Sequence, residues 1–359
     1  MNIKPWLDSS YLARYVFLNA VDISDYKVFP ERQIQNAAPV FHFGPAEQNA
    51  ILPILNQASP NSNMDRFLEQ NGTVAFLMVC NDKLVVERYY DGYDHASICT
   101  SFSTVKSFVS AVVGIALHEK LIHGLDDPIT RYLPELKAPH WSEITIRHLV
   151  SMSSGLGYKA NGFFPWNDEP RVYYSLDLRG LACKATKAES PGMHFHYNNY
   201  NLVLLGMILE CVTGRAVSEY LQEKIWKPLG MEFPASWSLD SQHSGMEKME
   251  SGLNARAVDF AKFGRLYLRR GDWNGKQIIP ESWVHESTTI EPNAAWTNYK
   301  YLWWLPRSGK GRFMAVGNLG QFIYIAPDKD CIILRFGRGK PRNWQRIYPQ
   351  LFGAIVDAL

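Results

Sequence analysis

Ser103-Thr-Val-Lys106 and the apolar run directly after it, Ser107-Phe-Val-Ser-Ala-Val-Val-Gly-Ile-Ala-Leu117, decide how this chain folds. The run is apolar on nearly every side, which predicts a helix buried inside a larger body. In a helix that begins near Ser103, Lys106 lies one turn further along on the same face. A serine hydroxyl is a weak nucleophile until a base removes its proton, and burial disfavours the charged form of a lysine amine. The spacing therefore indicates a serine activated by a lysine.

The four-residue pattern alone leaves a second interpretation open. It is expected by chance about once in a chain of this length, and Ser24-Asp-Tyr-Lys27 repeats it with no apolar helix behind it. Serine also favours the N-cap position of helices, so Ser103 is equally compatible with a capping role. The choice depends on partner residues elsewhere in the chain.

The composition indicates a folded protein without the charge pattern of a nucleic-acid or membrane-surface binder. The 359 residues can form one large domain or two, and 46% of them are hydrophobic, which is enough for a substantial core. Lys and Arg number 37 against 35 Asp and Glu, with no run of like charge, so neither a nucleic-acid surface nor a polybasic membrane anchor is expected. The longest apolar stretch falls short of the roughly 18 residues that a membrane span needs.

The cysteines and histidines suggest neither a disulfide framework nor a metal site. The five cysteines, at 80, 99, 183, 211 and 331, are odd in number and lack a C-x-x-C pair, which predicts buried reduced thiols. With no convincing signal peptide, we expect a cytoplasmic protein. His118 and His123 are five helical steps apart, which places them roughly 140° apart around a helix. No cofactor is expected, and P-loop and G-x-G-x-x-G patterns, which would indicate nucleotide binding, are missing from the sequence. The G-x-S-x-G elbow is missing too, which argues against an α/β-hydrolase.

The order of periodic segments predicts an α/β (α+β) fold. Two β-rich runs, 73–80 and 83–90, flank Asn81-Asp82 and predict a hairpin. Helices are expected at 201–211, 217–226, 259–268 and 342–358, and strands at 301–304, 312–316, 321–325 and 331–336. We therefore predict one antiparallel sheet flanked by helices and built from 66–100 and 251–359, with 101–250 inserted as a mostly helical lobe and 1–65 as an N-terminal extension.

Two further segments offer partners for Ser103 and Lys106. In Tyr197-Asn-Asn199, a tyrosine held near a lysine amine can relay a proton, and Asn199 can position both Lys106 and a substrate carbonyl. In Gly317-Asn-Leu-Gly320, glycine allows close approach of the backbone, so the N–H groups of Ser103 and Asn318 could form an oxyanion hole. Taken singly, a packed tyrosine on a turn and a glycine bulge are the ordinary interpretations.

Ser103-x-x-Lys106, Tyr197-x-Asn199 and the late glycine motif, in that order, resemble the serine β-lactamase and penicillin-binding-protein superfamily. The likeness is to its class C-like branch, which includes esterases, D-Ala-D-Ala carboxypeptidases and 6-aminohexanoate-dimer hydrolases. It extends over about 70–350, including 125–134, 144–156 and 252–264. The resemblance implies a β-lactamase/transpeptidase-like fold, acylation of Ser103, and proton transfer by Lys106 and Tyr197.

The resemblance implies a serine hydrolase that cleaves an ester or amide of a small acyl substrate through an acyl-enzyme. At 315, where β-lactamases carry Lys or His before x-Gly, this chain has Ala315, so strong β-lactam hydrolysis is not expected. A D-amino-acid peptidase or weak β-lactamase of the same fold is the alternative, and a non-catalytic binding protein is a second. Phe164, Trp166 and Tyr173, between the two catalytic motifs, are predicted to line an acyl pocket.

Overall fold

The computed structural model describes residues 9–18, 21–47, 51–60, 62–160, 164–290, 298–306 and 310–359. Its main feature is an eight-stranded sheet of order β10-β11-β12-β13-β14-β3-β4-β2. The strands are β2 Gly44–Pro45, β3 Thr73–Cys80, β4 Lys83–Tyr89, β10 Tyr299–Lys300, β11 Trp303–Trp304, β12 Phe313–Gly317, β13 Gln321–Ala326 and β14 Cys331–Gly337. Neighbours pair antiparallel except β2 with β4. The predicted sheet, assembled from both ends of the chain, is confirmed.

The hairpin of β3 and β4 forms because its turn residues tolerate left-handed backbone. Asn81 and Asp82 have φ values of 51° and 59°, the pair of positive angles that a two-residue turn between twisted strands requires. Alternate side chains of β3 then enter opposite layers of the core, with Leu77 and Val79 on one face and Phe76 and Met78 on the other. The sheet is therefore buried on both sides.

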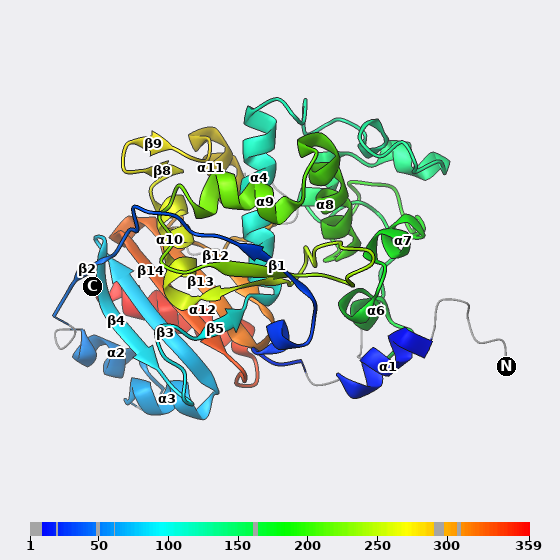
Figure 1. The fold of residues 1–359 in the computed structure, drawn as a ribbon. Helices are drawn as coiled ribbons and strands as arrows, with labels where there is room; N and C mark the ends of the chain where they lie inside the picture. Colours follow the sequence, from blue (N-terminus) through cyan, green and yellow to red (C-terminus); the bar gives the residue numbers. More distant parts are fainter. Residues whose placement is uncertain are drawn as a thin grey trace.

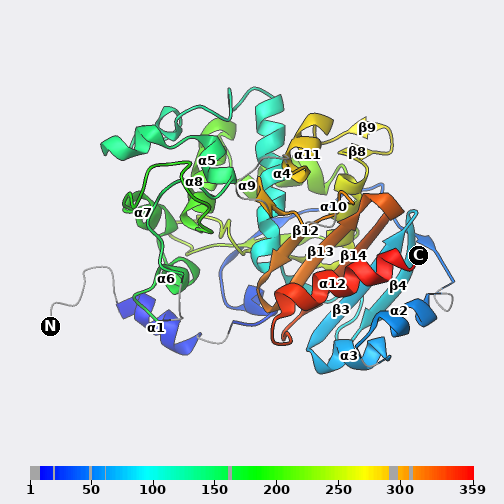
Figure 2. The same ribbon diagram turned by 180° about the vertical axis from the view of Figure 1, so that it is seen from behind.

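Helices cover each face of this sheet. Figure 2 shows α12 (Trp344–Asp357) crossing one face, which α2 (Leu52–Ala58) and α3 (Met64–Gln70) also cover. On the other face, Figure 1 shows α10 (Ala257–Leu268) and the long α4 (Val105–His118), which stands between the sheet and the helical lobe. The sequence predicts α10 and α12 to within two residues at each end.

The lobe inserted in the chain between β4 and the later strands of the main sheet is mostly helical, as predicted (Figure 1). It contains α5 Ile146–Val150, α6 Asp168–Tyr174, α7 Leu178–Cys183, α8 Tyr200–Thr213, and α9 Val217–Leu221 continued by a π-helical turn Gln222–Trp226. Among the described residues, no single helix is long and apolar enough to cross a membrane. Only α8 and the helix after it reach that length together, and they are bent by 70°.

A second, four-stranded sheet of order β1-β6-β7-β5 was not predicted. Its strands are β1 Glu31–Ile34, β5 Ile98–Thr100, β6 Ala235–Ser238 and β7 Leu253–Arg256. All four residues of β6 are buried, and its alternation, Ala-Ser-Trp-Ser, is too short to stand out as a strand in the sequence. Through β1, and through β2 in the main sheet, the N-terminal region is built into both sheets. It also forms α1 (Ser9–Phe17), which packs beside α6.

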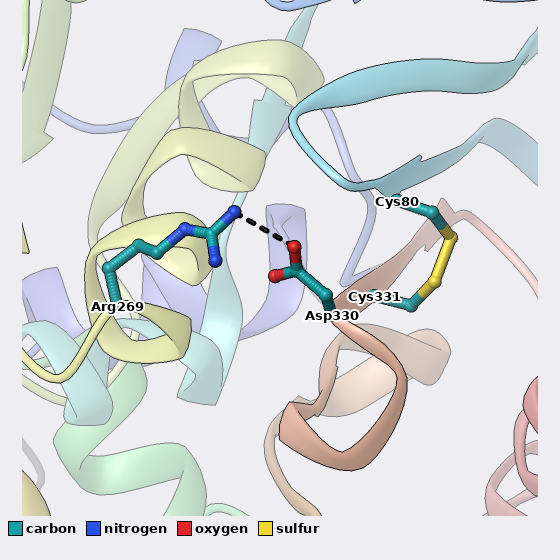
Figure 3. Close-up of a disulfide and its surroundings, with 4 residues drawn as sticks. All are labelled: Cys80, Arg269, Asp330 and Cys331. Carbon is teal, nitrogen blue, oxygen red and sulfur yellow. Dashed lines mark hydrogen bonds and ion pairs between the residues drawn. A yellow bond between two sulfur atoms is a disulfide. The ribbon is translucent and has the colours of Figure 1, made fainter.

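The expectation that all cysteines are reduced is wrong for two of them. Cys80 ends β3 and Cys331 begins β14, directly opposite in the strand register, and their sulfurs form a disulfide (Figure 3). The two cysteines are 251 positions apart in the sequence, so the sequence does not reveal that their strands are neighbours. Cys99, Cys183 and Cys211 are free, but of these only Cys99 is buried as predicted, while Cys183 is half-buried and Cys211 is exposed. Beside the disulfide, Arg269 Nη2 donates to Asp330 Oδ2 at 2.9 Å.

The double variant Cys80→Ser/Cys331→Ser is expected to lower the free energy of unfolding by about 2–4 kcal/mol, because the cross-link closes a very long loop in the unfolded chain. Urea unfolding of the oxidised protein, with and without dithiothreitol, measures this difference. Dithiothreitol should lower the stability of the parent and leave the double variant unchanged. Equal stability of parent and double variant would contradict the prediction.

Candidate active site

Ser103 and Lys106 meet at the start of α4. A 3-10 turn, Phe102–Thr104, precedes the helix, and within it Thr104 Oγ1 donates to Ser101 O at 2.8 Å. Phe102 has φ 45°, a left-handed conformation that is strained for an aromatic residue. Lys106 is 1% exposed, and its Nζ donates to Ser103 Oγ at 2.8 Å and to Glu250 O at 2.9 Å. The lysine thus lies within proton-transfer distance of the serine.

The loop before α8 brings Tyr197 to the same place. Asn198 fixes this loop by donating from Nδ2 to Leu156 O at 3.0 Å. Lys106 Nζ lies 4.9 Å from the centroid of the Tyr197 ring, and the ring stacks on Trp304 with centroids 6.0 Å apart. Among the described residues, no hydrogen bond joins the Tyr197 hydroxyl to Ser103 or Lys106. The structure therefore brings Tyr197 against the amine through its ring face.

Asn199 is held differently from the sequence-based expectation. Its side chain was expected to position Lys106. Instead, its Nδ2 donates hydrogen bonds to Tyr158 Oη at 3.0 Å and to Glu169 Oε2 at 3.1 Å. A carboxylate only accepts hydrogen bonds, so the amide nitrogen must face Glu169 and the oxygen must face away. Burial raises the pKa of Tyr158 well above its usual value, aided by Glu169. The atom of Asn199 left without a partner among the described residues is consequently an acceptor, the buried Oδ1.

The end of β12 lies against the 3-10 turn that carries Ser103. A Cβ at Gly317 would be 2.7 Å from Ser101 O and 3.2 Å from Ser103 N, so even alanine is excluded by the backbone it meets. The residue after it, Asn318, lines the same cavity as Ser103. This close approach is what an oxyanion hole from the Ser103 and Asn318 N–H groups needs.

The cavity beside Ser103 has a volume of about 50 Å³, close to that of two water molecules in the liquid. It is lined by Val21, Phe102, Ser103, Glu169, Tyr173, Asn199, Glu250, Ser251 and Asn318. The two glutamates and Val21 were not predicted. They come from segments with no motif, and only the folded chain brings them together.

Two residues that line this cavity, Asn199 and Glu250, each have a buried acceptor atom without a hydrogen-bond partner among the described residues, Oδ1 and Oε2 respectively. The other oxygen of Glu250 pairs with Lys248 Nζ at 3.3 Å and accepts from Ser251 Oγ at 2.8 Å. Burial lowers the pKa of Lys248. Since an unpaired buried acceptor costs about 1–3 kcal/mol, the cavity favours a ligand with N–H or O–H donors.

Of the three predicted pocket residues, only Tyr173 lines this cavity. Phe164 and Trp166 are each 55% exposed and stack on one another with ring centroids 5.1 Å apart.

Ala315, at the position where β-lactamases carry a cation, is buried within β12. A cation nevertheless stands near the cavity, because Lys340 Nζ donates to Asn318 Oδ1 at 2.7 Å. In the part of the chain that the structure describes, no group of three His, Cys, Asp or Glu side chains is arranged to hold a metal.

A buried helix carrying a serine and a lysine, set between an antiparallel sheet and a helical lobe, is the arrangement of serine β-lactamases. The chain belongs to this family, since the Beta-lactamase family model matches residues 61–353. It is 23% identical over 334 residues to the 6-aminohexanoate-dimer hydrolase of Paenarthrobacter ureafaciens, covering 87% of this chain and 84% of that one.

Solved structures agree in fold. One, titled "Putative 6-aminohexanoate-dimer hydrolase from Bacillus anthracis", is 26% identical, has a TM-score of 0.84, and covers 99% of this chain and 96% of its own. A class C β-lactamase superposes with a TM-score of 0.66 at 14% identity, covering 90% of this chain and 99% of its own. The second likeness concerns the fold alone. The β-lactamase-like fold expected from the sequence is thus confirmed.

Proposed function

We propose that this protein is a serine hydrolase that cleaves an ester or amide of a small acyl group through an acyl-enzyme on Ser103. The observation that carries the proposal is the 2.8 Å contact between Lys106 Nζ and Ser103 Oγ at the wall of a cavity. Family membership supports it.

In this mechanism Ser103 Oγ attacks the substrate carbonyl carbon while its proton passes to the pair formed by Lys106 and Tyr197. The negative charge on the carbonyl oxygen is stabilised by the N–H groups of Ser103 and Asn318. The pair returns the proton to the departing alcohol or amine as the carbon–heteroatom bond breaks. Water then attacks the ester on Ser103, and the same groups carry its proton back to Oγ, releasing the acid.

A fluorophosphonate probe tests this assignment directly. Tryptic mass spectrometry of the treated protein should find one adduct, on Ser103, and the protein should release p-nitrophenol from short p-nitrophenyl esters. A protein that neither labels at Ser103 nor turns over any ester would instead be the non-catalytic binding protein that the sequence left open.

The unpartnered acceptors favour an acyl group that carries an amine. Asn199 and Glu250 line the cavity with Ser103, and each has a buried acceptor oxygen without a partner among the described residues. A protonated amine that reached Asn199 Oδ1 and Glu250 Oε2 would supply hydrogen bonds and positive charge to both. The small volume favours a compact group such as an aminoacyl residue. The named relatives act on a 6-aminohexanoate dimer, whose longer chain also bears an amine.

Glu250→Gln is expected to reduce the preference for an amine-bearing acyl group about tenfold or more, because a hydrogen bond to a charged group is worth about 1.5–3 kcal/mol. The measurement compares kcat/KM for alanine p-nitroanilide with that for isobutyryl p-nitroanilide, in which a methyl replaces the ammonium. A 6-aminohexanoyl anilide extends the comparison to the relatives' substrate. Glu281→Gln, on an exposed side chain, is the control. An unchanged ratio in Glu250→Gln would refute amine recognition by this carboxylate.

One observation favours the peptidase alternative. Lys340 lies beside Asn318 although Ala315 occupies the usual cation position, so a substrate with a terminal carboxylate would meet a positive charge at the cavity. Turnover of D-alanyl peptides or nitrocefin, lost in Lys340→Met, would identify this activity.

A further inference from the structure

One wall of the cavity comes from the N-terminal region rather than from the catalytic motifs. Val21 lines the cavity together with Glu169 and Tyr173 of α6 and with Glu250. It precedes the part of the chain matched by the family model, which begins at residue 61. Pockets that bind small molecules usually measure about 300–1,000 Å³, far more than the 50 Å³ found here. The acyl group that fits beside Ser103 is therefore limited by the walls, Val21 among them.

The segment that carries Val21 is fixed to the body of the protein. Ile23 is fully buried, and its carbonyl accepts from Thr100 N at 3.0 Å on β5. Tyr26 N donates to Thr100 Oγ1 at 3.2 Å. Asp22 pairs with Arg338 at 3.4 Å. These contacts hold the backbone directly after residue 21 in a defined position, so the segment that follows Val21 is part of the folded structure.

Asp25 connects this segment to another wall of the cavity. Its Oδ2 accepts a hydrogen bond from Tyr173 Oη, and burial raises the pKa of the carboxyl to about 6. The Tyr173 carbonyl accepts from Lys248 Nζ at 2.5 Å, and this ammonium also lies 4.5 Å from the Tyr173 ring centroid. Lys248 in turn pairs with Glu250, whose carbonyl accepts from Lys106. The N-terminal segment is therefore in continuous contact with the groups around the nucleophile.

We propose that residues 21–29 set the size of the acyl group that this enzyme accepts, with Val21 as the specificity-determining residue and Asp25 as a positioning residue that fixes Tyr173. The inference rests on the proposed hydrolase function, since it concerns the pocket of the same serine. None of the catalytic motifs lies in the N-terminal region, and this inference gives that region a role in substrate selection.

The test measures kcat/KM for p-nitrophenyl acetate, butyrate and hexanoate. Val21→Ala should raise the hexanoate-to-acetate ratio about tenfold, because one or two methylenes of space in an apolar pocket change discrimination by that order. Val21→Phe should lower the same ratio. Val28→Ala, an exposed position in the same segment, should leave it unchanged. Opposite shifts from enlarging and reducing one side chain cannot both arise from misfolding.

Asp25 is tested by a pair of variants. Asp25→Ala should raise KM and broaden the acyl-length profile while kcat changes less than threefold, since Tyr173 loses its partner and the nucleophile is untouched. Asp25→Asn keeps an oxygen that accepts from the Tyr173 hydroxyl and should restore the parent profile. A purely structural role would give both variants the parent's profile with lower Tm.

The outcomes separate the two proposals. If the parent protein hydrolyses the esters and the chain-length profile is the same in Val21→Ala and Val21→Phe, the inference about the N-terminal wall is overturned and the hydrolase assignment stands. If the parent neither hydrolyses any ester nor labels with fluorophosphonate at Ser103, the hydrolase assignment itself fails.

Discussion

Ser103→Ala is expected to lower kcat/KM at least about 10³-fold on any substrate that the protein turns over, because the variant has no oxygen to form the acyl-enzyme. The residual rate would come from substrate binding and from the backbone N–H groups at Ser103 and Asn318. Steady-state kinetics on the best ester of the panel gives this ratio, and intact-protein mass spectrometry should show no fluorophosphonate adduct. A variant that keeps more than a tenth of the parent activity would exclude Ser103 as the nucleophile.

Two further variants complete this test. Ser107→Ala, on the same helix, removes a buried hydrogen bond of 2.9 Å to Leu302 O and reports the cost of losing a serine that is not the nucleophile. The double variant Ser103→Ala/Lys106→Ala should be no slower than Ser103→Ala alone, since residues that act as one unit have non-additive effects. An additional large loss in the double variant would place Lys106 in a separate role.

Arg335→Met is expected to reduce the free energy of unfolding by about 3–5 kcal/mol, the scale of removing one partner from a buried polar cluster. Arg335 is fully buried in β14, and its five N–H groups donate to Thr73 Oγ1 and to the carbonyls of Asn71, Leu319, Gly320 and Gly339. Burial lowers its pKa to about 10. Without the guanidinium, these acceptors lie in the core with no donor.

Urea denaturation followed by tryptophan fluorescence measures this loss. Arg270→Met is the matched control, because Arg270 is 77% exposed in its ion pair with Glu281 and such pairs contribute about 0–1 kcal/mol. Arg335→Lys should be intermediate, since an ammonium has three donors instead of five. Equal free energies of unfolding for the Arg335→Met and Arg270→Met variants would show that the buried Arg335 cluster does not stabilise the fold. Because Leu319 and Gly320 directly follow Asn318, Arg335→Met should also lower activity.

The sequence predicts those parts of the fold and site that are local in the chain. The Asn81-Asp82 turn, the apolar run of α4 and the one-turn spacing of Ser103 and Lys106 each depend on a few consecutive residues. The order of the three motifs indicates the family because each has a recognisable pattern. The one-turn spacing predicts that Lys106 and Ser103 lie on one face, and the structure realises it with Ser103 in the 3-10 turn that leads into α4.

The features that the sequence could not reveal depend on long-range pairing. β1 and β6 are each four residues long and about 200 apart, and nothing in either indicates the other. The disulfide needs Cys80 and Cys331 to lie in register across two strands, which no spacing rule predicts. Glu169 and Glu250 reach the cavity from unrelated segments, so their carboxylates resemble ordinary surface charges until the chain is folded.

The presence of Val21 at the cavity bears on how substrate ranges diversify among such hydrolases. A segment that contributes a wall but no reacting group can accumulate substitutions without endangering the nucleophile or its base. Two paralogues could then agree at every position within residues 61–353 and still prefer different substrates. A phylogenetic classification restricted to that matched region would group the two as having the same function. Assigning the substrate of one paralogue to the other would then be wrong.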